Sequence, residues 1–139
     1  MLVITKRIRV KSSGENDIVN ITEDISRAIM ESRIRNGVVT VFAVGSTAAI
    51  TTIEYEMGLL EDFPRILSKM APKDIEYKHN IAWNDGNGHS HIRSSLIGPS
   101  LTVPIVDCNL SLGIWQQIVF MEMDTRPRHR EIVLQIMGQ

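Results

Sequence analysis

Three of the four histidines in the chain fall within thirteen residues, in a polar stretch that also contains an acid, an amide and two glycines. The side chains that could do chemistry there are His79, Asp85, Asn87, His89 and His91. Imidazole is the commonest metal-binding side chain, and three imidazoles with one open position form the usual catalytic zinc site. We therefore expect a divalent metal, with zinc as the first candidate, at His79, His89 and His91. A general acid–base site is equally compatible with the stretch, and an ordinary polar turn is the third interpretation.

The roles within this stretch depend on its local structure. His89 and His91 are two residues apart, so they share a face on a strand but not on a helix. Asp85 could orient an imidazole, bind the metal itself or move a proton. We expect Asp85 and His89 to be catalytic groups and Asn87 to contact a ligand.

The stretch "GSTAAITTIEYE" (45–56) contains a second set of candidates. Ser46 and Thr47 fall at a strand junction, where backbone N–H groups can bind an anion, and a turn of small residues is a nearly even alternative. Glu54 lies at the end of the next predicted strand. It is a candidate base or metal ligand, although a solvated carboxylate is its default interpretation.

Arginines alternate in the segment "RPRHR" (126–130), so on an extended chain they point the same way. Guanidinium groups at this spacing suit phosphate or pyrophosphate, which makes Arg128 and Arg130 ligand-binding candidates. His129, between them, would point to the opposite face. An equally good interpretation is that the arginines form ion pairs on a neighbouring strand or subunit, with Glu122, Asp124 or Glu131.

The segment "LGIWQQI" (112–118) places a glycine before a bulky strand, which allows another molecule to approach closely. Trp115 and Gln116 could therefore line a pocket or an oligomer interface. A position in the core is at least as good an interpretation for Trp115.

The composition is that of one ordinary globular domain, residues 1–139. Hydrophobic residues make up 43%, and the formal net charge of −1 argues against a general nucleic-acid binder, which carries a basic excess. The first thirteen residues alternate and are cut by charges, unlike a signal peptide or a membrane span. A single cysteine, Cys108, excludes an internal disulfide and suits a reducing compartment. We expect a cytoplasmic protein with neither membrane nor nucleic acid as a partner.

The hydrophobic pattern predicts a fold dominated by strands. The expected strands are 2–10, 17–21, 38–44, 47–55, 100–106, 114–123 and 130–138. One helix should begin with Thr22 as its N-cap and run to about Asn36, with Gly37 as its stop. Residues 59–70 have helical spacing, with Pro64 at a break or first turn, and "HSHIRSSLIG" could form a short helix. Two or three helices and strands grouped toward the C-terminus favour an α+β domain with a mostly antiparallel or mixed, sandwich-like sheet.

Four stretches taken together resemble the YjbQ-like family of small bacterial and archaeal proteins. They are "STAAITTIEYE" (46–56), "YKH" (77–79), "NGHSHIRSSLIGPSLTVPI" (87–105) and "LSLGIWQQIVFMEMDTRPRHREIVLQIMG" (110–138). The resemblance covers nearly the whole chain and implies one α+β domain that assembles into a homotrimer. It also implies histidines gathered in a metal-binding cleft at a subunit boundary. The implied activity is a weak, secondary thiamine-phosphate synthase reaction, which joins a pyrimidine pyrophosphate to a thiazole phosphate and releases pyrophosphate.

Several residues match the motifs of this family position by position. His79 matches the histidine of a "Y-x-H" motif, and His91 matches that of an "H-[IL]-[KR]" motif. Glu54 matches the acid at the end of the "T-A" strand. The other matches are Trp115 and Gln116, with "G-x-W-Q", and Arg128 and Arg130, with the C-terminal arginines.

The chain departs from the family at Gly45 or Ser46, where many members carry a histidine. His89 is an additional histidine here, so we infer a compensated site in which it joins His79 and His91. The alternative is that this branch has lost the metal. Because the pocket is rebuilt, the departure also bears on whether the synthase activity is retained.

Three functions are compatible with these residues. The first is thiamine-phosphate condensation, in which arginines hold pyrophosphate and Glu54 or Asp85 moves a proton. The absence of a P-loop or a DDxxD cluster weakens it. The second is zinc-dependent hydrolysis of an unknown substrate, with water activated by the metal. The third is a non-enzymatic trimer that binds a metal or a small ligand.

Overall fold

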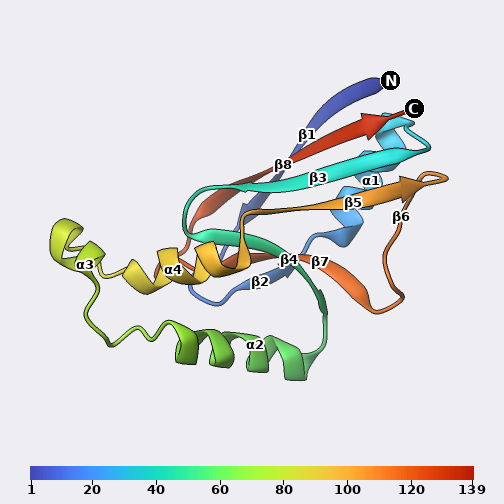
Figure 1. Cartoon of the computed structure of the whole chain (residues 1–139). Coiled ribbons are helices and arrows are strands. Elements are labelled where there is room, and N and C mark those ends of the chain that lie inside the picture. The colour runs from blue at the N-terminus through green and yellow to red at the C-terminus, as the bar shows by residue number, and fades with distance from the viewer.

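A five-stranded antiparallel sheet carries the longest strands of the molecule (Figure 1). The computed structural model describes all residues, Met1–Gln139. Across the sheet the strands are β1 (Leu2–Lys11), β8 (His129–Gly138), β3 (Gly37–Val44), β5 (Ser100–Val106) and β6 (Asn109–Leu110). In β3, Val39, Val41 and Ala43 are buried, whereas Phe42 and Val44 are exposed. This alternation gives the sheet an inner face in the core and an outer face with exposed side chains.

A smaller antiparallel sheet packs against the inner face of the first one. Its strands, in order, are β2 (Ile18–Asn20), β7 (Gln116–Glu122) and β4 (Ala48–Glu54). On one face of β7, Ile118 and Phe120 belong to the main core of 18 buried residues, together with residues of β3, β5 and β8. On its other face, Val119 and Met121 form a second cluster with Leu67. Strand β7 is therefore buried on both faces.

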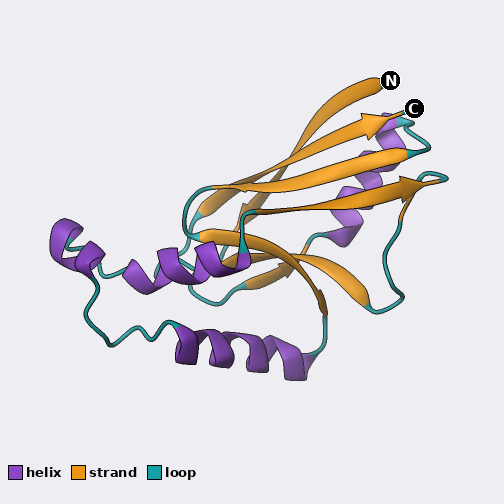
Figure 2. Cartoon of the chain, in the orientation of Figure 1, coloured by secondary structure: helices purple, strands orange, loops and turns teal.

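Four helices complete the fold. They are α1 (Thr22–Ser32), α2 (Met57–Met70), α3 (Lys78–Trp83) and α4 (Gly88–Ile97). Helix α1 inserts Ile25 and Ile29 into the main core, and α2 lies beneath the smaller sheet, where Leu67 packs (Figure 2). Helices α3 and α4 lie at the end of the molecule where β3 turns into β4 (Figure 1). None of the four has the length and apolar character that crossing a bilayer requires.

The α+β class predicted from the sequence is confirmed, with one domain, two packed sheets and antiparallel pairing throughout. The structure adds α3, which the sequence analysis did not expect. Helix α2 begins at Met57, because the carboxylate of Glu56 accepts the backbone N–H groups of Gly58 (2.8 Å) and Leu59 (2.5 Å). The break predicted at Pro64 is absent, since this residue lies inside the helix.

The predicted ends of α1 were wrong. Thr22 is the first helical residue and not the N-cap, and its hydroxyl accepts the backbone N–H of Ile118 at 2.8 Å. The hydroxyl is thus used to join α1 to β7. At the other end, the helix stops at Ser32, and Arg33 takes a left-handed φ of 62°.

Gly37 begins β3 and does not stop α1 as predicted. It lies directly opposite Gly138 of β8. A Cβ atom on Gly37 would lie 1.9 Å from the carbonyl oxygen of Met137, so the backbones approach each other too closely for any side chain there.

Candidate functional site

Two short helices bring His79 and His91 together. Helix α3 ends at Trp83, and its C-cap Asn84 takes a left-handed φ of 54°. The following turn has Gly86 at a φ of 68° before α4 begins. The two imidazole ring centroids are 4.4 Å apart, and the rings are tilted by 55°. Both histidines are only half-buried. The pair is therefore open to a ligand.

Gly88 sets the separation of these two helices. Its backbone N–H donates to Oδ1 of Asn80 at 2.8 Å, which ties the start of α4 to α3. A Cβ atom on Gly88 would lie 2.6 Å from Cβ of Tyr77. A larger residue would push α4 away from α3 and separate the two histidines.

Asn87 is buried beneath His79 and links it to two carboxylates. In one orientation of its amide, Oδ1 faces Nε2 of His79 at 3.0 Å and Nδ2 donates to Oδ1 of Asp124 at 3.4 Å. In the other orientation, Nδ2 donates to both carboxylate oxygens of Asp85, at 2.9 and 3.1 Å, and to Nε2 of His79 at 3.0 Å. The first orientation requires a proton on Nε2 of His79, and the second requires Nε2 to accept a hydrogen bond. The second forms shorter hydrogen bonds and satisfies Asp85, so we favour it for the protein without ligand.

Asp124 lies below Asn87 and is almost fully buried. Its Oδ2 accepts the hydroxyl of Thr47 at 3.1 Å and Nη2 of Arg128 at 2.6 Å. Burial alone would raise the pKa of Asp124. Hydrogen bonds from the Thr125 backbone N–H and the Thr47 hydroxyl, with one from Asn87 in the first orientation of its amide, act together with the charge of Arg128. They outweigh burial and hold the pKa of Asp124 below its usual value. Asp124 is therefore an anion at neutral pH.

The innermost layer of the site is a buried ion pair between Glu122 and Arg130. The guanidinium donates from Nε at 2.9 Å and from Nη2 at 2.5 Å to the two carboxylate oxygens. Nη2 also donates to the hydroxyl of Thr47 at 2.7 Å, and the hydroxyl of Ser12 donates to Glu122 at 2.6 Å. Thr47 therefore connects this pair to Asp124 above it.

His91 is favoured in its neutral form. Burial lowers its pKa most, and a positive charge on His79 lowers it further, while Asp124 and Asp85 raise it by less. A neutral imidazole has a free nitrogen lone pair at pH 7. It can accept a proton or bind a metal.

His89 does not join the other two histidines, although the sequence predicted a triad. It is fully buried on the opposite side of α4, with Nε2 hydrogen-bonded to Glu15 and Nδ1 without a partner. The reason is that two residues separated by two positions in a helix differ by about 200° around the helix axis. No group of three or more His, Cys, Asp or Glu side chains is arranged to hold a metal ion. The chain thus offers two imidazoles, and Asp85, 3.4 Å from Nε2 of His79, is the nearest further candidate ligand.

Comparison with known proteins agrees with the fold and the motifs. The family described as "UPF0047 protein YjbQ-like" matches residues 6–139. The chain belongs to this YjbQ-like family. A UPF0047 protein of Methanothermobacter thermautotrophicus is 38% identical over the whole chain and 95% of its own length, and one of Archaeoglobus fulgidus is 35% identical over 91% of the chain and 96% of its own length.

Solved YjbQ-like structures share the same architecture. A protein of Sulfolobus solfataricus, described as being of unknown function, superposes with a TM-score of 0.93 at 31% identity, over 99% of both chains. A hypothetical protein of Aeropyrum pernix superposes with a TM-score of 0.90, also at 31% identity, over 98% of this chain and 99% of its own. These relatives establish the fold and the family, and their descriptions name no substrate.

The YjbQ-like fold places the other predicted site residues at the far end of β4. Glu54 lies opposite Gln116 of β7, and with the exposed Trp115 they line a hollow of about 300 Å³. Thr47 and Glu54 are separated by the length of β4, which is about 20 Å at the usual rise per residue. Within one chain, Glu54, Trp115 and Gln116 therefore do not reach the histidine pair.

The remaining candidates divide between the two interpretations offered by the sequence. Arg128 and Arg130 form ion pairs with Asp124 and Glu122, two of the acids that the second interpretation named. Thr47 belongs to the site through its hydroxyl, whereas Ser46 is exposed in the turn between β3 and β4.

Sequence reasoning gave no role in the site to Asp124 and Glu122 beyond that of ion-pair partners. The signal for them is their spacing: acids at 122 and 124, at the end of a buried strand, reach the same side as the alternating arginines that follow. Ser12 and Glu15 had no such signal, because they come from a loop more than 100 residues before β7 joins β8.

Proposed function

We propose that the protein is an enzyme that acts on a phosphorylated small molecule at the His79–His91 pair. The reaction that we propose is the thiamine-phosphate condensation that the family resemblance implies. The observation that carries the proposal is a half-open pair of imidazoles above an ionised, buried carboxylate that holds an arginine. Perturbed ionisable groups gathered in this way are typical of catalytic sites.

In this reaction the bond between the pyrimidine methylene carbon and the pyrophosphate oxygen breaks, and the electron pair leaves with pyrophosphate. The ring nitrogen of the thiazole forms the new bond to carbon. The main task of the protein is to stabilise the negative charge on the departing oxygen. Arg128 is suited to this, because Asp124 accepts only its Nη2 and the side chain is about one-third exposed.

His79 would supply the second donor to the leaving group. When the amide of Asn87 turns its oxygen toward His79, the imidazole must carry a proton on the Nε2 atom that faces it. When the amide turns its nitrogen toward His79, the proton must be on Nδ1. Asn87 therefore acts as a positioning residue that decides which nitrogen of His79 donates.

The test is a turnover assay with a pyrimidine pyrophosphate and a thiazole phosphate, in which thiamine phosphate and released pyrophosphate are both measured. We expect His79→Gln and Asn87→Ala to lower the rate by about 100-fold, the usual size of one electrostatic contribution. Asn109→Ala, at the exposed first residue of β6, is the matched control and should leave the rate unchanged. Turnover that is equal in all four proteins would reject this site.

A second candidate function is zinc-dependent hydrolysis, favoured by the two adjacent imidazoles and the carboxylate of Asp85. Zinc would supply an activated water, but a catalytic site with three protein ligands needs Asp85 to turn toward the rings. Elemental analysis of tag-free protein tests this. About one zinc per chain, lost in His91→Ala, would support it, whereas metal-free protein after incubation with zinc would reject it. Metal without turnover on any substrate would instead support a non-enzymatic metal-binding trimer.

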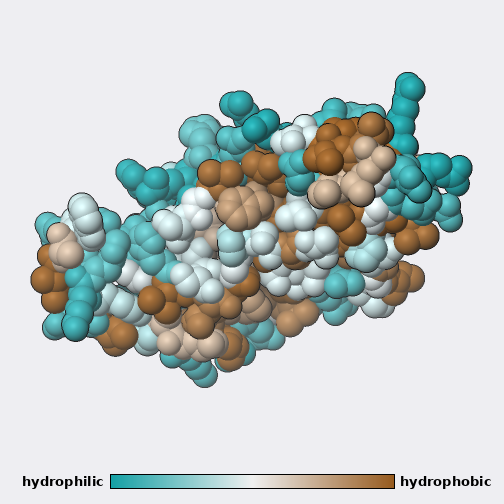
Figure 3. All heavy atoms as spheres, turned by 45° about the horizontal axis from the view of Figure 1, so that its top comes forward, coloured by the Kyte–Doolittle hydropathy of each residue, from teal (hydrophilic) through white to brown (hydrophobic).

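We also propose that the protein works as a homotrimer in the cytoplasm. The trimer is supported by exposed apolar side chains on the outer face of the five-stranded sheet, and Figure 3 shows apolar patches among polar side chains on the face it presents. These side chains are Phe42, Val44, Val106 and Met137. Light scattering should give a mass of about 47 kDa, three times the chain mass of 15.7 kDa. A mass of one chain would contradict this.

A further inference from the structure

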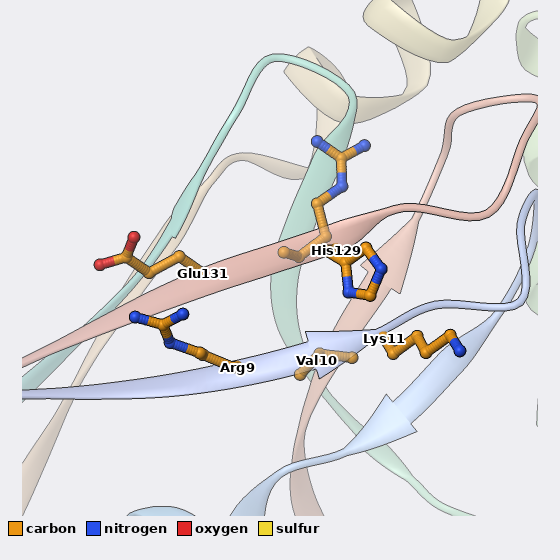
Figure 4. Close-up of a pocket in the computed structure, with 6 residues that line it drawn as sticks. Arg9, Val10, Lys11, His129 and Glu131 are labelled. Carbon is orange, nitrogen blue, oxygen red and sulfur yellow. The ribbon is translucent and has the colours of Figure 1, made fainter.

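The outer face of the five-stranded sheet carries a hollow between β1 and β8 that is separate from the histidine pair (Figure 4). It has a volume of about 420 Å³ and is lined by Arg9, Val10, Lys11, His129, Arg130 and Glu131. Val10 is the one apolar residue in this lining, and it is buried. A ligand entering the hollow therefore meets a polar and charged surface.

The register of the two strands gathers the charged side chains on one face. Lys11 lies opposite His129, and Arg9 lies opposite Glu131. Alternate residues of a strand share a face, so these four side chains lie on the outer face. In Figure 4 the side chains of Arg9 and Glu131 extend toward one end of the hollow, and that of Lys11 extends toward the other end. Arg130 points to the other face, where it is paired with the buried carboxylate of Glu122.

The positive charge of this face is not neutralised within the chain. The one carboxylate there, Glu131, is already paired with Arg7, whose Nε lies 2.6 Å from Oε1. No carboxylate oxygen lies within 4.0 Å of the charged atoms of Arg9, Lys11 or His129. Arg9 and Lys11 are therefore two charges on the outer face without a carboxylate partner within 4.0 Å, and an anion can contact both.

We propose that this hollow is a binding site for the phosphate or diphosphate group of a small molecule. The guanidinium of Arg9 can donate two parallel hydrogen bonds to phosphate oxygens, and Lys11 adds a compact charge at the other end of the hollow. The volume matches that of a small-ligand site. A nucleic acid would need a longer basic surface, and the chain has a net charge of −1.

This site does not depend on the function proposed for His79 and His91. The two cationic side chains that would bind the phosphate, Arg9 and Lys11, lie on the outer face of β1. The histidine pair is connected to β8 through Arg130, whose side chain points to the inner face. Either proposal can therefore fail while the other stands.

Isothermal titration calorimetry with sodium pyrophosphate tests the site. The informative variant is Arg9→Gln combined with Lys11→Gln. The matched control is Lys6→Gln combined with Arg27→Gln, which removes the same charge from exposed pairs with Glu31 and Asp24. We expect the dissociation constant to rise by about tenfold or more in the first variant and to change by less than about twofold in the control.

No saturable pyrophosphate binding by the unaltered protein, or an equal loss in both double variants, would overturn the proposal. Thermal unfolding checks that the variants are folded, and Lys11→Gln alone replaces the double variant if it is not. A second readout is the imidazole signal of His129 in an NMR titration, which should move with pyrophosphate and stay still if the hollow is not the site.

Discussion

Glu122→Gln exchanges one carboxylate oxygen for an amide nitrogen. This change should destabilise the protein more than the corresponding exchange at any other acid of the site. The carboxylate accepts four hydrogen bonds, from the Ser12 hydroxyl, Nε and Nη2 of Arg130, and the backbone N–H of Asp124. An amide cannot accept all four, because its nitrogen would face donors. Arg130 would then be a buried charge without a partner, which costs about 3–5 kcal/mol.

A loss of this size is a large part of the free energy of unfolding of about 5–15 kcal/mol that is typical of a domain. At about 3–4 °C per kcal/mol, the midpoint of thermal unfolding should fall by about 10–20 °C. Glu131→Gln is the control, because its pair with Arg7 is exposed and contributes about 0–1 kcal/mol.

The reasoning also predicts coupling between the two partners. Glu122→Met together with Arg130→Met removes both charges of this pair and leaves neither one unpaired. The double variant should therefore lose less stability than the sum of the losses of the two single Met variants, by about 2 kcal/mol or more. Urea unfolding of the four proteins gives these values. A loss below about 1 kcal/mol for Glu122→Gln, or simple additivity in the double variant, would refute the account.

Two further predictions concern pH and backbone contact. Because the folded chain lowers the pKa of His91, the unfolded chain binds this proton more readily, and stability should fall as the pH drops below about 6.5. His91→Gln should flatten that part of the curve in urea unfolding at pH 5.5 and 7.5; an unchanged slope would contradict the assignment. Gly37→Ala should cost about 3 kcal/mol, since its Cβ would meet the Met137 carbonyl oxygen at 1.9 Å, whereas Gly113→Ala, with its nearest neighbours at 3.6 Å, should stay within about 0.5 kcal/mol. Equal unfolding midpoints for the two glycine variants would refute the steric argument.

The strands could be predicted from the sequence because their signal is local. The run of β-branched residues in β3 and the alternation of residue types in β1 and β8 directly indicate which side chains are buried. The helix ends were harder, because Thr22 and Gly37 have residue types that usually cap helices but are used here in tertiary contacts. Helix α3 has six residues and no buried face, so it left no periodic pattern to find.

The site was predicted only in part, because some of its contacts join residues that are far apart in the sequence. Clustering in the sequence identified His79 and His91. The short helix expected over "HSHIRSSLIG" already places His89 and His91 on different faces, but the histidine missing near Gly45 favoured a triad that included His89. The two interpretations of the C-terminal arginines could not be separated. The ion pairs depend on Asp124 and Glu122 lying beside Arg128 and Arg130 after β7 and β8 have folded.

The four histidines allow one measurement to test the central claim, that substrate binds at the His79–His91 pair. The imidazole signals can be followed by NMR while a pyrimidine pyrophosphate and a thiazole phosphate are added to saturation. The account predicts that the signals of His79 and His91 move together with the substrates, while that of the buried His89 does not. Signals of His79 and His91 that stay in place at saturation would contradict it.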